Sequence, residues 1–270
     1  MFGIEKKLFE QLVFLREEYK LEAIKAEFEA EGSSFNDLVR LRRLTEKAGV
    51  KLYLKIGGVE AVRDIKDSLE LGVDGLIAPM VETSFGLKKF LSAYREVYKN
   101  HRIKLSINIE TRNAIEELDD IIEYGRGKID NITLGRTDLS DSFMDENIKP
   151  DSDFIFELVE GVGKKAVLNG FNFTVGGSIS QNTIEKFLEH PDWYESITSI
   201  ETRKVVLPRN IMLFKEGALE EALKFEELYI LSKKEISDVM IESELKRLAK
   251  LEDRKKKTVA KEVNLTFYTL

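Results

Sequence analysis

The sequence predicts an α/β protein, a closed (β/α)8 barrel of the TIM type with additional C-terminal helices. Between about residue 21 and residue 205, short apolar runs alternate with amphipathic helical stretches, which is the pattern of parallel βα units. The repeats are roughly 25 to 35 residues long, and no Gly-x-Gly-x-x-Gly turn follows the first run. Together these observations favour a closed barrel over an open dinucleotide-binding sheet.

Each expected unit consists of a β-like run and the helix that follows it. In the first, residues 21–32 alternate apolar and charged residues, Ser33 or Ser34 can cap the next helix, and Gly49 can end it. The five units after it are 51–58 with 59–72, 74–80 with 83–100, 104–111 with 113–125, 130–135 with 153–170, and 172–180 with 182–190. The seventh and eighth strands are both expected within residues 196–207.

The chain becomes helical and strongly charged from Asn210 onward. Apolar residues between Leu213 and Phe225 suit a helix packed on the barrel, and a second apolar stripe runs from Ile236 to Leu248. We predict a barrel with an N-terminal helix over residues 1–225 and a C-terminal helical extension and tail over residues 226–270. The second stripe is expected to pack on a neighbouring subunit or to cap the barrel, and the alternative is a solvated extension.

Composition narrows the classes of function. The net charge of −7 and the pI near 5.3 argue against binding to nucleic acid or to an anionic membrane. The absence of cysteine excludes disulfides, a thiol nucleophile and sulfur-ligated zinc. The charged N-terminal segment resembles neither a signal peptide nor a membrane span. We therefore expect a cytoplasmic protein that acts on a small molecule.

The residues at the ends of the strands point to a metal site, because active groups of such barrels lie at that rim. Acids outnumber bases there, and crowded carboxylates raise one another's pKa unless a cation is present. Glu110 and Asp138 follow adjacent strands about 4.8 Å apart, so both can reach one Mg²⁺ or Mn²⁺ ion. The alternative is that either acid merely caps a helix or forms a salt bridge.

Three segments carry a resemblance to a known family. PMVET (79–83), INIET (107–111) and LGRTDLS (134–140), in this order and spacing, resemble the HpcH/HpaI aldolase and citrate lyase β-subunit family of phosphoenolpyruvate/pyruvate-binding barrels. The resemblance implies a metal-dependent lyase or aldolase that acts on a 2-oxo acid, or on a citrate or acyl-CoA type of substrate, through an enolate. By position, Glu110 and Asp138 match the two metal carboxylates, and Glu82 matches an acid that supports the site.

Two departures from the family pattern concern the catalytic groups. Lys55 stands where the family usually has an arginine beside the enolate, and it keeps the charge but loses the bidentate fork. Ala30 stands where the base would fall, which leaves Glu29 as the first candidate for the base, ahead of Glu31, Lys55 or a metal-bound water. The predicted catalytic residues are Lys55, Glu29 and Arg136.

Substrate-binding residues are predicted less directly. Arg136 and Arg203 can replace the missing arginine in holding a carboxylate or phosphate, or can simply pair with the surplus acids. Gly176 and Gly177 can cradle a substrate anion with their N–H groups, or can only make room for a tight turn. The alternative to an enzyme is a barrel that has lost catalysis and acts in binding or assembly. The resemblance also implies a homo-oligomer joined through the C-terminal helices.

Overall fold

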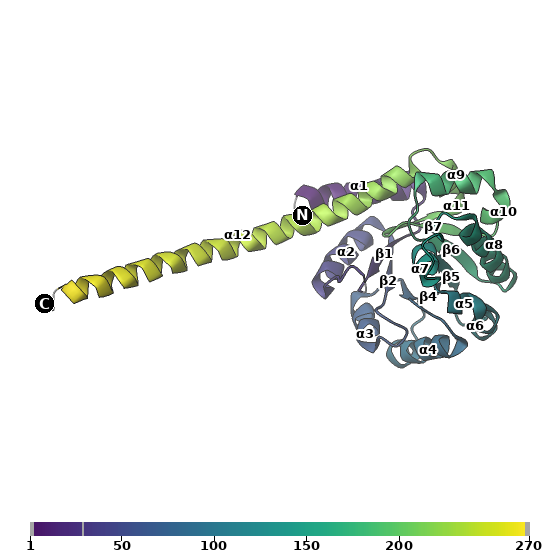
Figure 1. Cartoon of the computed structure of the whole chain (residues 1–270), viewed down its shortest axis with the longest axis horizontal. Helices are drawn as coiled ribbons and strands as arrows, with labels where there is room; N and C mark the ends of the chain where they lie inside the picture. The colour runs from purple at the N-terminus through teal and green to yellow at the C-terminus, as the bar shows by residue number, and fades with distance from the viewer. Residues whose placement is uncertain (1–2, 29, 268–270) are drawn as a thin grey trace.

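Eight strands close into a barrel in chain order, and helices surround it (Figure 1). The computed structural model describes residues 3–28 and 30–267, with side chains as far as residue 257. The strands are β1 (Ala23–Glu27), β2 (Lys51–Lys55), β3 (Gly75–Ala78), β4 (Lys104–Ile109), β5 (Asn131–Gly135), β6 (Asn172–Gly176), β7 (Ser199–Glu201) and β8 (Val205–Pro208). The predicted barrel is confirmed.

The helices follow the strands as expected for most of the chain. Ser34 forms a capping box at the start of the first barrel helix, and Gly49 ends that helix in the left-handed conformation with φ 66°. The helices are α1 (Gly3–Tyr19), α2 (Phe35–Ala48), α3 (Val62–Leu71), α4 (Ser84–Tyr98), α5 (Arg112–Glu116), α6 (Leu118–Gly125), α7 (Arg136–Ser142), α8 (Asp153–Leu168), α9 (Gln181–Glu189), α10 (Pro191–Tyr194), α11 (Arg209–Phe214) and α12 (Ala218–Phe267).

The last strand departs from a barrel of eight parallel units. β1 to β7 pair in parallel, whereas β8 is antiparallel to both β7 and β1. Only the segment 202–204 joins β7 to β8. A parallel crossover needs about a dozen residues or more, so this connection can only form a hairpin. The hairpin places Thr202, Arg203 and Lys204 at the carboxyl ends of the parallel strands.

The barrel's two faces differ in chemistry. Outward residues such as Ile24, Leu52 and Ile107 are buried under the helices. Inside the barrel, a small apolar cluster lies beside buried polar side chains, and Ile77 of this cluster pairs in register with Ser106. Asn131 donates to Ser106 Oγ at 2.8 Å and accepts from Thr174 Oγ1 at 2.9 Å. The apolar cluster consists of Ala23, Tyr53, Ile77 and Val206.

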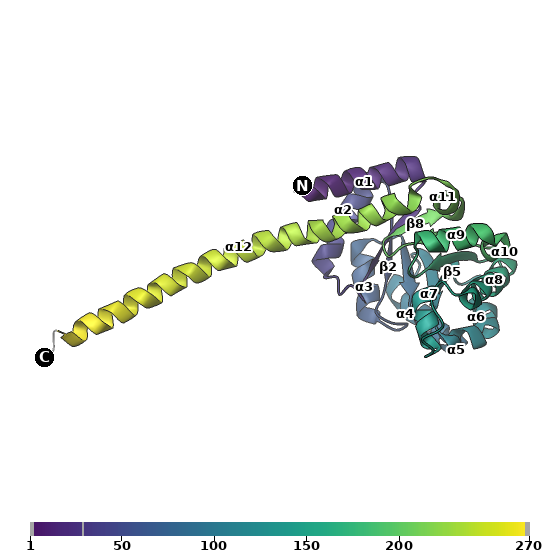
Figure 2. The ribbon, with the colours of Figure 1, turned by 45° about the horizontal axis from the view of Figure 1, so that its top comes forward.

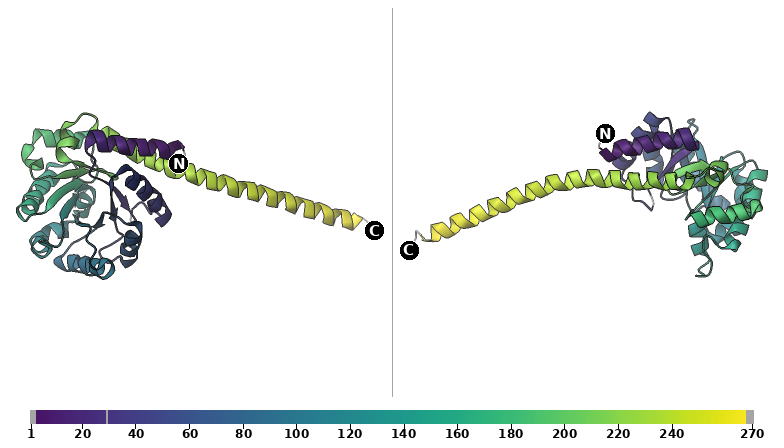
Figure 3. Two further views of the ribbon diagram at one scale, coloured as in Figure 1. Left: turned by 180° about the vertical axis from the view of Figure 1, so that it is seen from behind. Right: turned by 90° about the horizontal axis from the view of Figure 1, so that it is seen from above.

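The helix α12 takes the place of an eighth barrel helix and then continues past the barrel. It lies side by side with α1 in every view (Figures 1, 2 and 3), and Gln11 Nε2 donates to Glu221 Oε2 at 2.7 Å between them. We expected separate helices here, but the structure has one helix of 50 residues. No glycine or proline follows Gly217, so no residue interrupts it.

The two parts of α12 have different surroundings. Ala222, Phe225 and Tyr229 are buried against the barrel, whereas every side chain over 237–257 is exposed. The division into a barrel ending at residue 225 and an extension from residue 226 stays a prediction. Within the described part of the chain, none of the helices combines the length and apolar content of a membrane span.

Candidate active site

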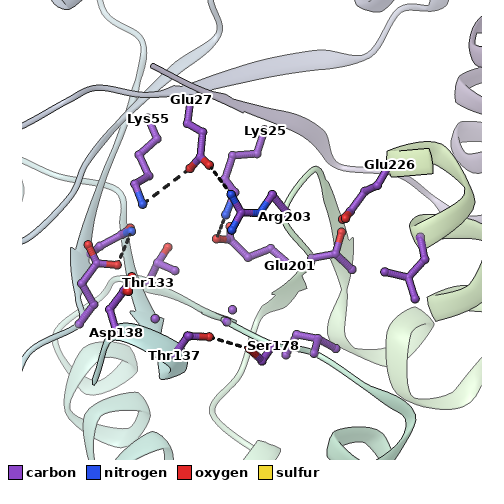
Figure 4. A pocket seen from close by; sticks show the side chains of 18 residues that line it. Lys25, Glu27, Lys55, Thr133, Thr137, Asp138, Ser178, Glu201, Arg203 and Glu226 are labelled. Atoms are coloured by element: carbon purple, nitrogen blue, oxygen red, sulfur yellow. Dashed lines mark hydrogen bonds and ion pairs between the residues drawn. The ribbon is translucent and has the colours of Figure 1, made fainter. Parts of the chain in front are cut away.

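A cavity of about 310 Å³ opens at the carboxyl ends of the parallel strands. Side chains from β1, β2, β4 and β7 enter it, the loops after β5 and β6 form one wall, and Leu223 and Glu226 of α12 reach its edge. Figure 4 shows ten of these side chains labelled. Six of the predicted site residues line this cavity, namely Lys55, Glu110, Asp138, Gly176, Gly177 and Arg203.

Glu110 is the most constrained of the acids. It directly follows β4, and only 2% of its surface is exposed. Its carboxylate accepts hydrogen bonds from Met80 N at 2.9 Å and from Asn108 Nδ2 at 3.0 Å. Burial raises the pKa of this carboxyl, while the charge of Lys55 and these two hydrogen bonds act in the opposite direction and the charge of Asp138 adds to the rise.

Gly135 makes the position of Glu110 possible. A Cβ atom on Gly135, at the end of β5, would lie 2.7 Å from Glu110 Oε2, which is closer than real atoms approach. The neighbouring strand must therefore carry glycine at this point for the carboxylate to sit at the rim.

The donor set suits a hard divalent cation. Asp138 lies on α7, is exposed, and points into the cavity (Figure 4). Glu110 lines the same cavity. Asn108 Oδ1 also belongs to this wall and is buried without a hydrogen-bond partner among the described residues. Two carboxylates and an amide oxygen match the oxygen ligands that Mg²⁺ uses alongside water. No group of three His, Cys, Asp or Glu suited to a metal occurs in the described residues, so water and substrate would complete the coordination.

A network of ion pairs occupies the opposite wall (Figure 4). The buried Glu27 lies 3.7 Å from Lys55 Nζ and accepts from Arg203 Nη1 at 3.0 Å. Below it, Lys25 Nζ lies 2.5 Å from Glu201 Oε1, and both side chains are buried. The carboxylates therefore hold these cations in fixed positions around the cavity.

Lys25 is a cavity residue that the sequence reading missed. It lies on β1 two residues before Glu27, so both side chains point into the barrel. Lys25 was missed because only residues at the ends of strands were considered as candidates. The alternation of side chains along the strand could have identified it, since Lys25 and Glu27 are two residues apart.

Arg136 lies elsewhere than predicted. Its side chain is fully buried behind the cavity wall, where Nη1 pairs with Asp151 at 2.8 Å and Nη2 donates to Gly177 O at 2.7 Å and Thr183 Oγ1 at 3.3 Å. A guanidinium with these acceptors is directed away from the cavity and cannot grip a substrate there. The prediction that Arg136 is catalytic is therefore corrected to a role in holding the loops after β5 and β6.

The remaining predicted residues are placed as follows. Glu82 follows β3 and is half-buried, but it is not among the described residues around the cavity. Glu29 lies outside the described residues. A Cβ on Gly176 would lie 2.8 Å from Glu201 Cγ, and one on Gly177, with φ +85°, would lie 2.6 Å from Thr137 N. Close packing thus accounts for both glycines, and their contact with a substrate stays a prediction.

Comparison with known proteins identifies the family of the chain. A sequence profile of the HpcH/HpaI aldolase/citrate lyase family matches residues 35–175, a range that includes Lys55, Glu82, Glu110 and Asp138. No curated protein sequence matches the chain significantly.

Several solved structures share the fold. An HpcH/HpaI aldolase from Desulfitobacterium hafniense DCB-2 has a TM-score of 0.57 and 16% identity, covering 72% of this chain and 82% of its own. A HpcH/HpaI aldolase/citrate lyase family protein from Burkholderia cenocepacia J2315 has a TM-score of 0.58 and 13% identity over the same shares. The citrate synthase SbnG has a TM-score of 0.56 and 17% identity, covering 86% of this chain and 90% of its own.

Proposed function

Because the chain belongs to the HpcH/HpaI aldolase/citrate lyase family, we propose that it is a divalent-metal-dependent carbon–carbon lyase or aldolase. The substrate is a pyruvate-like 2-oxo acid, which reacts through an enolate. One observation carries the proposal: Glu110 and Asp138 face one cavity, where Glu110 is buried and Asn108 Oδ1 has no partner among the described residues.

The charge of the cavity supports a dication. Three cations and five carboxylates line it, which leaves an excess of two negative charges. A divalent cation such as Mg²⁺ or Mn²⁺ held by Glu110 and Asp138 would balance this excess and, as a Lewis acid, would stabilise negative charge on the enolate oxygen. The charged lining residues are Lys25, Lys55, Arg203, Glu27, Glu110, Asp138, Glu201 and Glu226.

The chain's own cations orient the substrate in this proposal. Lys55 lies within the electrostatic reach of Glu110 and is tied to Glu27, so its ammonium is positioned to stabilise an oxyanion between them. Arg203 is more than half exposed at the tip of the β7–β8 hairpin, where it can meet a substrate carboxylate that enters the cavity. Glu29 remains the proposed base, and Gly176, Gly177 and Glu82 remain proposed to support substrate binding.

We also propose that the protein forms a homo-oligomer through α12. The exposed part of this helix carries large apolar residues, and apolar surface of this kind usually marks an interface. The residues are Val239, Met240, Ile241, Leu245, Leu248 and Leu251.

The first prediction tests the reaction by hydrogen exchange at the methyl group of pyruvate. In D₂O with Mn²⁺ or Mg²⁺, the wild-type protein should exchange methyl protons for deuterium, because an enolate forms and is reprotonated. Glu110→Ala should slow this exchange by about a hundredfold or more, since even partners of metal ligands cost 10- to 100-fold when removed. Proton NMR of the pyruvate methyl signal measures the rate.

The matched control is Glu116→Ala, which removes an exposed carboxylate on α5 that pairs with Arg112. It should exchange at the wild-type rate. If wild-type protein shows no exchange with either cation, the enzymatic proposal fails, and a barrel that acts in binding or assembly becomes the better description.

A further inference from the structure

A second cavity, of about 460 Å³, opens at the other end of the barrel, where the parallel strands begin. Three lysines meet there: Lys20 follows α1, Lys51 begins β2 and Lys104 begins β4. Asn172 and Ser199, which begin β6 and β7, supply polar groups to the same cavity. We call it the lysine cavity. It lies at the rim opposite the candidate active site.

The three ammonium groups have no carboxylate within ion-pair distance among the described residues. This contrasts with Lys25 and Lys204, the two most buried lysines, each of which pairs with a glutamate. The lining acid Glu22 accepts a hydrogen bond from Ser199 Oγ at 2.7 Å. The lining of the lysine cavity therefore carries three lysines and one glutamate, an excess of two positive charges in a chain whose net charge is −7.

Lys104 is the centre of this arrangement. Its side chain is half-buried, and its ammonium lies 5.0 Å from the centre of the buried Tyr53 ring. Burial lowers the pKa of Lys104 and the charge of Lys51 adds to the lowering, while the charges of Glu22, Asp130 and Glu201 act in the opposite direction. Partial desolvation of a cation is costly, and a bound anion would reduce that cost.

We propose that the lysine cavity binds a compact oxyanion with two or more negative charges, such as a diphosphate or a tricarboxylate. Three lysines that line one cavity favour a multiply charged ligand over a single carboxylate, and lysine is a common point-charge partner of phosphate. The Asn172 side chain adds a hydrogen-bond donor at the edge of the cavity. A site here is separate from the proposed reaction and does not depend on it.

Binding is tested with the full-length protein in EDTA at low ionic strength, using calorimetry with inorganic pyrophosphate in one arm and tricarballylate in the other. We expect one site for at least one probe, weakened tenfold or more by Lys104→Gln. Lys66→Gln, which removes an exposed lysine on α3, should leave the affinity unchanged. Asp138→Ala should also leave it unchanged, because Asp138 lines the other cavity. The probe that binds more tightly identifies phosphate or carboxylate as the preferred chemistry.

Thermal unfolding tests anion binding to the lysine cavity by an independent measurement. Without anion, Lys104→Gln should unfold at a higher temperature than wild type, because a half-buried cation that forms no ion pair among the described residues is gone, and pyrophosphate should no longer raise its Tm. If the Lys104 variant does not fold, Lys51→Gln, at an exposed position, takes its place in the binding test. Equal affinity of either probe for wild type and the lysine variant, or no binding of either probe to wild type, would overturn the proposal.

Discussion

Glu110, one of the two proposed metal ligands, holds its carboxylate in a position that costs stability when no cation is bound. Its carboxylate is buried beside Asn108, whose Oδ1 has no partner among the described residues. An ionised carboxylate in this position is costly without a cation, and burial accordingly raises the pKa of Glu110. The raised pKa means that ionisation of this group near neutral pH disfavours the metal-free fold.

The second prediction concerns Glu110→Gln. At neutral pH without metal, this variant should unfold at a higher temperature than wild type, because it removes a buried charge. The new amide keeps an acceptor for Met80 N and gains a donor toward Asn108, whose own amide can turn to accept it. Differential scanning fluorimetry should also show that Mn²⁺ stabilises wild type but not the variant. A lower Tm than wild type would contradict the expected cost of burying this charge.

The third prediction tests the space beside Glu110. Gly135→Ala introduces a Cβ that would lie 2.7 Å from Glu110 Oε2, so the carboxylate must move. We expect pyruvate exchange to fall about 10- to 100-fold, as for other changes that disturb the orientation of a metal ligand. Gly161→Ala in α8, where a Cβ meets nothing within 4 Å, is the control, and it should keep full exchange and gain up to about 1 kcal/mol in stability. Full exchange in Gly135→Ala would show that Glu110 needs no fixed position.

At the residue scale, the sequence predicts which residues follow a strand, but it does not predict the direction in which each side chain points. The position of Glu110 and Asp138 at one cavity could be predicted, because residues after parallel strands must gather at one rim; their role as metal ligands stays a prediction. Arg136 follows a strand in the same way, yet its side chain turns outward to Asp151, which is 15 residues further along the chain. That direction depends on the loop between α7 and α8, which no periodic pattern describes.

At the element scale, Arg136 joins loops that form one wall of the candidate active-site cavity. It contacts the segment before α8 through Asp151, the loop after β6 through Gly177, and α9 through Thr183. Burial alone would raise the pKa of Asp151, but hydrogen bonds from Asn182, Arg136 and Thr183 lower it below its usual range. The folded chain is therefore stabilised by the ionised form of Asp151.

The fourth prediction follows from this pair. Asp151→Asn should lower the free energy of unfolding at neutral pH by about 2 to 4 kcal/mol, because Arg136 remains buried without its counter-ion. The stabilisation is complete above the unfolded pKa of about 4 and is lost as the pH falls through the lowered folded pKa. Urea unfolding at several pH values should thus show the difference from wild type narrowing in acid.

The control for this pair is Asp119→Asn, which breaks an exposed ion pair with Lys165 and should change stability by less than about 1 kcal/mol. A loss in Asp151→Asn that is no greater than the control, or that stays constant down to low pH, would contradict a stabilising role for the buried pair.

Most elements could be predicted because the sequence alternates so regularly between strands and helices. The reversed β8 was not predicted, although the three residues between Glu201 and Val205 exclude a helical crossover. Both strands were predicted in the correct segment. Whether β8 runs parallel or antiparallel to β7 depends on the number of residues that connect them, which the apolar runs do not indicate. The continuity of α12 was also missed, because two separate apolar stripes suggested two helices.

At the scale of the whole molecule, the shape raises the question of what covers the far part of α12. The helix extends well past the barrel (Figure 3), and its side chains over 237–257 are all exposed. Ile241, Leu245 and Leu248 follow one another at spacings of four and three residues, so they form one ridge on the helix. A second copy of the chain, with the same ridge, is the occupant that we propose.

The fifth prediction is that Ile241→Glu, Leu245→Glu and Leu248→Glu, combined, convert the oligomer to a monomer of 31.0 kDa. Like charges would face one another across a contact that apolar side chains otherwise stabilise.

The control combines Ser243→Glu with Lys250→Glu, which changes the net charge by the same amount on the opposite face of the helix and should leave the oligomer intact. Light scattering coupled to gel filtration measures the mass. A wild-type monomer, or an unchanged mass in the triple variant, would show that this ridge does not join subunits. Because the ridge lies beyond the barrel, the variant should keep its barrel fold by circular dichroism, which separates loss of association from unfolding.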